Sequence, residues 1–246
     1  MKLSVLGSGS AGNCYLFDDG DRILMVECGV KFADVKKAVD FRISRIVGAI
    51  VSHEHKDHAR EAENVLKSKI PVGMSAGTAE SLGIEPKTGV IVMRELDVYR
   101  FGEYRVQPFR TKHDAREPFG FLIYHPQMGM TLFATDTYYL SYTFAGLSNI
   151  LIECNYALDI LDANVAAGVV PEILRDRTIK SHCSLQTCRE ILKANDLTGV
   201  NNIVLIHLSD GNSDAVRFRD DISELTGKHI RIAEPGMCID FDKTPF

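Results

Sequence analysis

The chain has 246 residues, of which 45% are hydrophobic and 25% charged, and its formal net charge is −5. This composition is ordinary for a soluble globular protein, and no apolar run is long enough to span a bilayer. The acidic balance argues against a broad nucleic-acid-coating surface. We expect one cytoplasmic domain over residues 1–246 without a signal peptide. The six cysteines include no C-x-x-C pair, which favours reduced thiols over a disulfide framework.

Short apolar runs that predict strands alternate with patterns of helical period. The expected strands are Leu3–Leu6, Cys14–Phe17, Ile23–Val26, Val47–Val51, Gly89–Met93, Arg105–Phe109, Phe119–Tyr124, Thr131–Ala134, Ile150–Glu153 and Asn202–His207. The expected helices are Val30–Val39, Arg60–Ser68, Leu185–Ala194 and Asp214–Leu225. Strands and helices mixed in this way indicate an α/β sandwich. The glycine-rich Gly7–Gly12 loop fits either a close backbone approach to a bound group or a simple hairpin turn.

The most informative segment is an H-x-H-x-D-H motif at residues 53–58. It offers four possible metal ligands, His53, His55, Asp57 and His58, and imidazole with carboxylate suits Zn²⁺, Mn²⁺ or Fe²⁺. Two ligands separated by one residue cannot share one side of a helix, so we expect the motif on a loop. The preceding apolar run predicts a buried strand, which places these side chains where a strand gives way to a helix.

Three more polar residues stand at the carboxyl ends of apolar runs: His113, Asp136 and His207. Each alone has an ordinary structural explanation, such as a turn for the aspartate. Together with the motif, they supply the number of ligands that two neighbouring metals need, including one bridging carboxylate. His125 and His229 have no such setting and are expected to be surface or core residues.

The order of these residues resembles that of the metallo-β-lactamase superfamily. The resemblance implies a four-layer αββα sandwich and two divalent metal ions, with Zn or Mn expected. It also implies that His53, His55 and His113 hold one metal, that Asp57, His58 and His207 hold the other, and that Asp136 bridges them.

Several further segments are similar to the YycJ/WalJ-like exonuclease branch of that superfamily. They are Leu6–Cys14, His113–Pro118, Ile152–Asn155, Ser181–Ser184 and His207–Ser209. Lactam hydrolysis is not expected, because His58 is present. The interval from Asp136 to His207 is too short for an inserted cap domain. The chain departs from the branch at Glu27, where the family usually has Asp, at Tyr156, where it often has His, and at Ser181, where it usually has Gly.

His182 is the remaining candidate catalytic residue. Ser184 is a good N-cap for the helix expected from Leu185, so His182 and the free N–H groups there would face an anion. An exposed loop histidine is the alternative. With His182 as general acid or oxyanion partner, Asp57 or Asp136 would orient the attacking water. Candidates for a basic rim are Lys56, Arg60, Lys112, Arg116, Arg175, Arg177 and Lys180.

The expected function is a dinuclear metal-dependent phosphodiesterase, and within that class a nuclease that acts on nucleic acid or a nucleotide. Hydrolysis of cyclic nucleotides, lactones or thioesters on the same site is the enzymatic alternative. A non-catalytic metal-binding or scaffold protein is the alternative from another class, disfavoured because all seven ligand types are present. The sequence leaves open the native metal, the choice between DNA and RNA as substrate, the polarity of digestion and whether the protein forms a homodimer. No membrane partner is expected.

Overall fold

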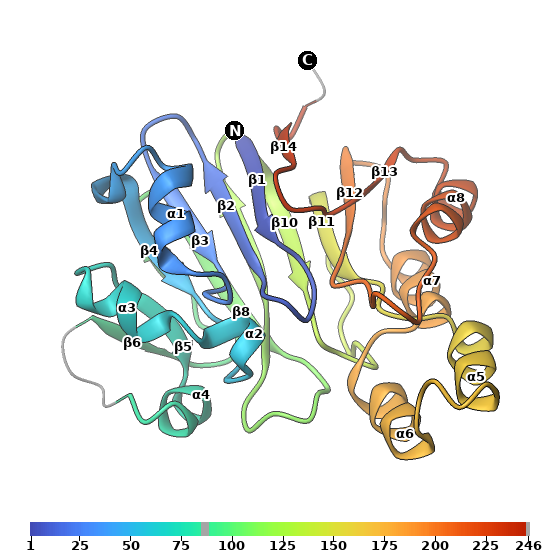
Figure 1. The fold of residues 1–246 in the computed structure, drawn as a ribbon. Coiled ribbons are helices and arrows are strands. Elements are labelled where there is room, and N and C mark those ends of the chain that lie inside the picture. The colour runs from blue at the N-terminus through green and yellow to red at the C-terminus, as the bar shows by residue number, and fades with distance from the viewer. Residues whose placement is uncertain (85–88, 245–246) are drawn as a thin grey trace.

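The computed structural model describes residues 1–84 and 89–244, which form two facing sheets with helices on their outer sides (Figure 1). In the described residues the first sheet has the strand order β14-β1-β2-β3-β4-β5-β6. These strands are β1 (Lys2–Gly7), β2 (Cys14–Asp18), β3 (Ile23–Val26), β4 (Ile46–Ile50), β5 (Val72–Ser75), β6 (Val90–Met93) and β14 (Cys238–Asp240). Strands β1 to β3 pair antiparallel, and β3 to β6 pair parallel.

The second sheet has the order β13-β12-β11-β10-β9-β8-β7 in the described residues. Its strands are β7 (Tyr99–Phe101), β8 (Tyr104–Arg110), β9 (Phe119–His125), β10 (Gly129–Ala134), β11 (Leu147–Glu153), β12 (Asn202–Ile206) and β13 (Ile230–Ile232). Here too an antiparallel part, β7 to β10, continues into a parallel part, β10 to β13. The carboxyl ends of the parallel strands are therefore free to carry functional loops.

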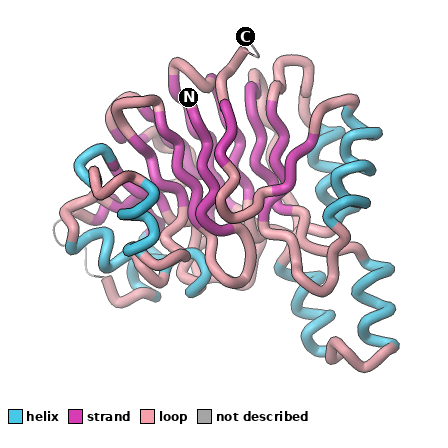
Figure 2. Tube along the Cα trace, turned by 45° about the horizontal axis from the view of Figure 1, so that its top comes forward, coloured by secondary structure: helices cyan, strands magenta, loops and turns pink. Residues whose placement is uncertain are grey.

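Helices cover the outer faces of both sheets. On the first sheet lie α1 (Phe32–Ala38), α2 (Lys56–Ala59), α3 (Ala62–Lys67) and α4 (Ala76–Ser81). A short 3₁₀ turn, Ile43–Arg45, directly precedes β4. On the second sheet lie α7 (Leu185–Ala194) and α8 (Ala215–Thr226), while α5 (Leu158–Ala166) and α6 (Glu172–Ser181) lie side by side beyond the strand ends (Figure 2). The expected αββα sandwich is confirmed.

The principal core lies between the sheets, where alternate residues of facing strands meet. Tyr15 of β2 packs edge-to-face on Phe133 of β10, with their ring centroids 5.4 Å apart, and both side chains are fully buried. Such aromatic pairs contribute about 0.5–1.5 kcal/mol beyond the area that they bury. Two further apolar clusters are present, one between the second sheet and its helices and one between the first sheet and its helices. The strand ends are thus held by packing on both faces of each sheet.

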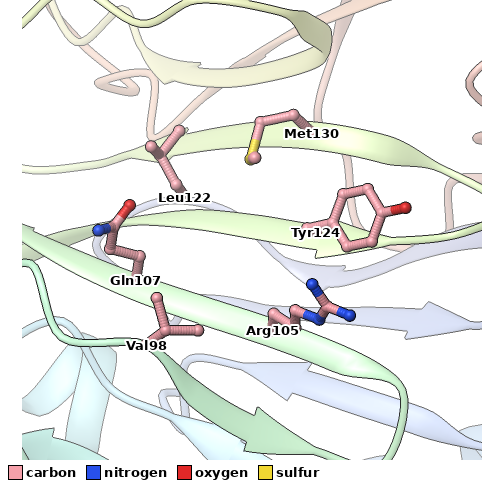
Figure 3. A pocket seen from close by; sticks show the side chains of 6 residues that line it. All are labelled: Val98, Arg105, Gln107, Leu122, Tyr124 and Met130. Atoms are coloured by element: carbon pink, nitrogen blue, oxygen red, sulfur yellow. The ribbon is translucent and has the colours of Figure 1, made fainter.

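The outer face of the second sheet carries a groove over β8, β9 and β10. Figure 3 shows side chains from these strands, together with Val98 just before β7, around this groove. The cavity has a volume of about 370 Å³. Its lining residues are Val98, Arg105, Gln107, Leu122, Tyr124 and Met130. Arg105 stacks on the Tyr124 ring at 5.6 Å from its centroid. This groove opens away from the inter-sheet core, because Val106, between two of the lining residues, points into that core.

The structure corrects two expectations near the H-x-H-x-D-H motif. His53 and His55 lie in a loop as expected, but Asp57 and His58 lie on the single helical turn α2. The helix expected over Arg60–Ser68 is instead α3, which begins only at Ala62. The break has a physical cause: the Asp57 carbonyl accepts a hydrogen bond from the Asn13 N–H, and the Glu61 N–H donates to the Cys28 carbonyl, so the helical bond between Glu61 and Asp57 is not formed.

The remaining expected strands and helices are present, with ends shifted by no more than three residues, the largest shift being at the start of β11. Sequence patterns alone do not reveal β5, β7, β13 and β14 or the helices α4, α5 and α6. No disulfide links the six cysteines, of which five are buried and Cys238 is exposed. His125 is a buried residue beside Asp19, and His229 is exposed, as expected. Among the described residues, none of the helices has the length and apolar character needed to traverse a bilayer.

Candidate metal centre

Side chains that follow strands of both sheets meet at one end of the sandwich. His53 and His55 follow β4, and Asp57 and His58 sit on the adjoining α2. His113 follows β8, Asp136 follows β10, and His207 follows β12. All seven residues that the sequence singles out as ligands are therefore brought together, four from the first sheet and three from the second.

One group of four residues could hold a metal ion: His53, His55, His113 and Asp136. Each offers one ligand atom, and these atoms all lie within 4.8 Å of one another. His55 Nδ1 is 3.1 Å from His113 Nε2. Asp136 Oδ2 is 3.3 Å from His113 Nε2 and 3.6 Å from His53 Nε2. The carboxylate oxygen and the ring nitrogens thus surround one point.

A second group consists of Asp57, His58 and His207. Asp57 Oδ2 lies 3.2 Å from His58 Nε2 and 3.2 Å from His207 Nε2. The oxygen Oδ2 of Asp136, which faces the first group, is also 3.4 Å from His58 Nε2. Asp136 therefore stands between the two groups, which is the position that a bridging carboxylate requires.

The donor set fits divalent metal ions. His53 Nε2 is buried and makes no hydrogen bond, although it points toward Asp136. A buried polar atom without a partner is costly, and a metal ion would satisfy it. Burial and the neighbouring His58 hold the pKa of His53 well below its ordinary value. The imidazole is therefore neutral, which is the form that binds metals.

Without a metal ion, the His207 imidazole of the second group binds its proton tightly. Burial would lower the pKa of His207, but the charge of Asp136 and the hydrogen bond to Asp57 raise it to about 10. Burial would raise the pKa of Asp136, but the charges of His207 and His58 hold it well below its usual range. Metals and protons therefore compete for the same nitrogens, so metal affinity falls as the pH falls.

Three residues at the centre adopt left-handed backbone conformations: the ligands Asp136 and His207, and the buried Glu27, whose Oε2 lies 3.5 Å from His58 Nδ1. Glu27 has φ 68°, Asp136 has φ 47° and His207 has φ 54°. Each stands just after a strand, β3, β10 or β12 respectively. Positive φ is uncommon outside glycine, and at these positions it turns the chain sharply at the strand end. The side chains consequently point across the end of the sandwich instead of continuing the alternation of the sheet.

Glu153 is a further residue of the centre, to which sequence patterns assign no role. It is fully buried at the end of β11, and its Oε2 accepts hydrogen bonds from the backbone N–H groups of Thr137 and Cys183, both at 3.0 Å. Its Oε1 is 2.7 Å from His182 Nδ1 and 3.3 Å from His207 Nδ1. A carboxylate at the end of an apolar run, the signal that marked Asp136, would have identified it.

His182 lies in the turn between α6 and α7, beside the metal centre. Its ring stacks on His207 with centroids 5.5 Å apart and an interplanar angle of 14°. The Ser184 hydroxyl accepts a hydrogen bond from the Thr187 N–H at 3.0 Å, so the expected N-cap is confirmed. Because Glu153 occupies Nδ1, the nitrogen Nε2 is the one left to contact a substrate. The structure also groups His182 and Glu153 with Asp136 and His207 as possible ligands.

The glycine-rich loop supports the second group. It is the hairpin connection between β1 and β2, and it also approaches the centre, so both alternatives apply. Asn13 at its end places Nδ2 3.2 Å from His58 Nε2. Gly29 explains a further close approach, because a Cβ there would lie 1.6 Å from the carbonyl oxygen of Asp57.

The seven candidate rim cations fall into different environments. Arg60 bonds backbone carbonyls, and Arg116 pairs with Glu80 at 2.8 Å. Arg175 pairs with Asp162 of α5 at 2.6 Å, and Arg177 pairs with Asp114. The other three, Lys56, Lys112 and Lys180, are exposed and form no ion pair with any described residue.

Comparison with known proteins agrees with this geometry. A sequence profile described as the metallo-beta-lactamase superfamily matches residues 7–136, which include the H-x-H-x-D-H motif, His113 and Asp136. Exodeoxyribonuclease WalJ of Streptococcus pneumoniae is 25% identical over 229 residues, covering 87% of this chain and 83% of that protein. Exodeoxyribonuclease YycJ of Bacillus anthracis is 29% identical over 174 residues, but that match spans only 65% of each chain, just under two thirds.

Solved structures show the same fold at low sequence identity. The metallo-beta-lactamase fold protein YhfI from Bacillus subtilis has a TM-score of 0.72 and 18% identity, covering 97% of this chain and 99% of that one. The short form of human tRNase Z has a TM-score of 0.62 and 16% identity, covering 98% and 99% of the two chains. The expected superfamily is confirmed by the sequence profile, and the similarity to YycJ and WalJ supports the YycJ/WalJ-like branch. The chain belongs to the metallo-beta-lactamase superfamily.

Proposed function

We propose that this chain is a dinuclear metal-dependent phosphodiesterase, and specifically an exodeoxyribonuclease of the YycJ/WalJ type. The observation that carries the proposal is the convergence of seven histidine and aspartate ligands beside the His182–Glu153 pair. The similarity to two exodeoxyribonucleases supports DNA as the substrate. Cytoplasmic location, a single domain and a homodimer stay predictions.

The residues that would hold the metals are those of the two groups. His53, His55 and His113 would bind one ion, Asp57, His58 and His207 the other, and Asp136 would bridge them. When bound, two divalent ions supply Lewis-acid polarisation of a phosphoryl group and acidify water. The chemistry of these ligands suits Zn²⁺ or Mn²⁺.

Asp57 would orient the attacking water. Burial would raise the pKa of Asp57, but hydrogen bonds from His207 and His58 hold it well below its usual range. Asp57 therefore stays a carboxylate and can accept a hydrogen bond from water in the pocket that it lines. An attack from this position requires the leaving oxygen to depart on the opposite side of phosphorus.

His182 would protonate the leaving oxygen. Burial would lower its pKa, but the charge and hydrogen bond of Glu153 raise it above the ordinary value. Glu153 also fixes the proton on Nδ1, so a protonated ring presents its second N–H from Nε2. Glu153 thus acts as a positioning residue, through His182.

We expect the purified protein to contain close to two metal ions per chain. Seven ligands with one shared carboxylate match two ions and exceed what one ion uses. Inductively coupled plasma mass spectrometry on protein dialysed against metal-free buffer measures the ratio. A ratio near one in fully loaded protein, or a metal that remains after all seven ligands are mutated, would contradict the dinuclear assignment.

The substrate class is tested by supplying the Mn²⁺-loaded protein with four substrates in parallel. Duplex DNA, single-stranded DNA, RNA and cyclic nucleotides should be compared at equal phosphate concentration. We expect release of mononucleotides from DNA ends and none from a circular strand, as befits an exonuclease. Preferential opening of cyclic nucleotides would instead favour the small-molecule alternative, and turnover of none of the four would reject the proposal.

A further inference from the structure

One face of α6 forms a wall of the pocket at the metal centre. The pocket has a volume of about 200 Å³, and its lining includes Leu174, Arg177, Thr178 and Ser181 of this helix. These positions recur at intervals of three and four residues, so they share one helix face. On the other walls stand ligands such as Asp57 and His207, together with His182. A substrate group that enters this pocket therefore lies beside α6.

Arg177 is held in place by the residue that follows a candidate ligand. Its Nε donates a hydrogen bond of 2.7 Å to Asp114 Oδ2, while Asp114 Oδ1 lies 3.3 Å from His113 Nε2. One carboxylate thus links the guanidinium to the first metal group. The two terminal nitrogens of Arg177 form no hydrogen bond with any described residue, and the side chain is 59% exposed. They are available to an anion in the pocket.

Arg175 provides the contrast on the same helix. It turns to the other side, where it pairs with Asp162 of α5 at 2.6 Å and with Asp176 at 3.3 Å. It does not line the pocket. Arg175 and Arg177 are two positions apart on the same helix, but only Arg177 lines the pocket at the metal centre.

Leu174 is the one apolar side chain of α6 among the lining residues. It is 45% exposed although it borders a pocket of charged and polar groups. Water is a poor neighbour for an exposed leucine side chain. The sugar and base of a nucleotide, in contrast, present apolar surface beside their phosphate. The preceding Ile173 is 82% exposed and lies off the pocket.

We propose that Arg177 and Leu174 form a subsite for the nucleotide next to the scissile phosphate. Arg177 binds the neighbouring phosphate through its two terminal nitrogens, because the planar guanidinium matches phosphate bidentately. Leu174 contacts the sugar or base of that nucleotide. The inference rests on the proposed phosphodiesterase function and makes the preferred substrate a polynucleotide strand, since a cyclic mononucleotide has no second phosphate to offer.

The test compares Arg177→Ala with Arg175→Ala. The probes are thymidine 5′-(4-nitrophenyl phosphate), which has one phosphate, and a fluorescent oligothymidylate, which has many. We expect Arg177→Ala to reduce the preference for the oligonucleotide in kcat/KM by roughly 10–100-fold, the size of a lost charged hydrogen bond. Arg177→Lys should recover only part of it, because ammonium cannot bind bidentately. Arg175→Ala should behave as the wild type.

A binding measurement separates the subsite from catalysis. Anisotropy with a phosphorothioate oligonucleotide at several salt concentrations should show a salt slope smaller by about one for Arg177→Ala. Leu174→Ala should weaken this binding while Ile173→Ala does not. If Arg177→Ala and Arg175→Ala have the same oligonucleotide preference and the same salt slope, the inference is overturned. The proposed function still stands in that case, provided that the wild type cleaves DNA. A wild type that cleaves neither probe rejects both.

Discussion

Asp136→Ala should abolish hydrolysis and reduce the metal content of both sites. Its Oδ2 faces His113 and His53 on one side and His58 on the other. A shared carboxylate screens two like charges that otherwise repel each other, so its loss should expel both ions, whereas loss of one terminal ligand weakens one. Metal analysis after dialysis, together with kcat on DNA, measures both effects.

The matched controls for this variant are Asp136→Asn and His207→Ala. Asparagine tolerates the left-handed backbone at this position, so it keeps the fold while removing the negative charge. It should lose metal nearly as fully as alanine does. His207→Ala should retain about one ion. A larger loss of total metal from His207→Ala than from Asp136→Ala would show that Asp136 does not bridge.

His182→Ala should retain both metals and yet lose roughly 10²–10⁴-fold in kcat, the usual size of one positioned acid–base group. The defect should appear in kcat more than in KM, because the proton transfer belongs to the transition state. It should shrink for a nitrophenyl ester, whose leaving group needs little protonation. His229→Ala, which removes an exposed histidine, is the control.

The pH profile gives a second measure of the same role. Glu153 raises the pKa of His182, so the acid form persists to a higher pH than for an ordinary histidine. The nearby metal cations act in the opposite direction. In either case the rate of the wild type should fall as the pH rises through the pKa of His182. His182→Ala should lack this alkaline limb, and Glu153→Gln should move it to lower pH. An alkaline limb that is unchanged in His182→Ala would assign it to another group.

The sequence was sufficient where local patterns carry the information. Ten of the strands are visible as apolar runs, and most ligands of the metal centre are visible as polar groups at the ends of such runs. The cap at Ser184 follows from local chemistry in the same way. The short strand β14 was not visible, because it depends on pairing with β1 across almost the whole chain. The helix α6 was also missed, since its apolar residues do not repeat on a core face and Ile173 stays in solvent.

The roles of the residues around the ligands could be assigned only from the three-dimensional structure. Glu153 becomes a partner of His182 only because β11 ends beside the turn before α7. Arg175 and Arg177 look equivalent in the sequence, yet their ion pairs with Asp162 and Asp114 place them on different sides of α6. Arg60 is a candidate for the rim of the site in the sequence, but its guanidinium bonds the Gly29 carbonyl in the connection between β3 and α1. Such assignments depend on long-range contacts that no local pattern encodes.

The left-handed conformations at Glu27, Asp136 and His207 set stability against activity. A non-glycine residue held in this region costs about 1–3 kcal/mol, and glycine would adopt it freely. A change to glycine at any of the three positions would relieve the backbone but delete a carboxylate or an imidazole of the centre. Selection for heat resistance alone would therefore favour stable but inactive variants at these positions. Stabilising changes in this protein are better sought away from these three strand ends.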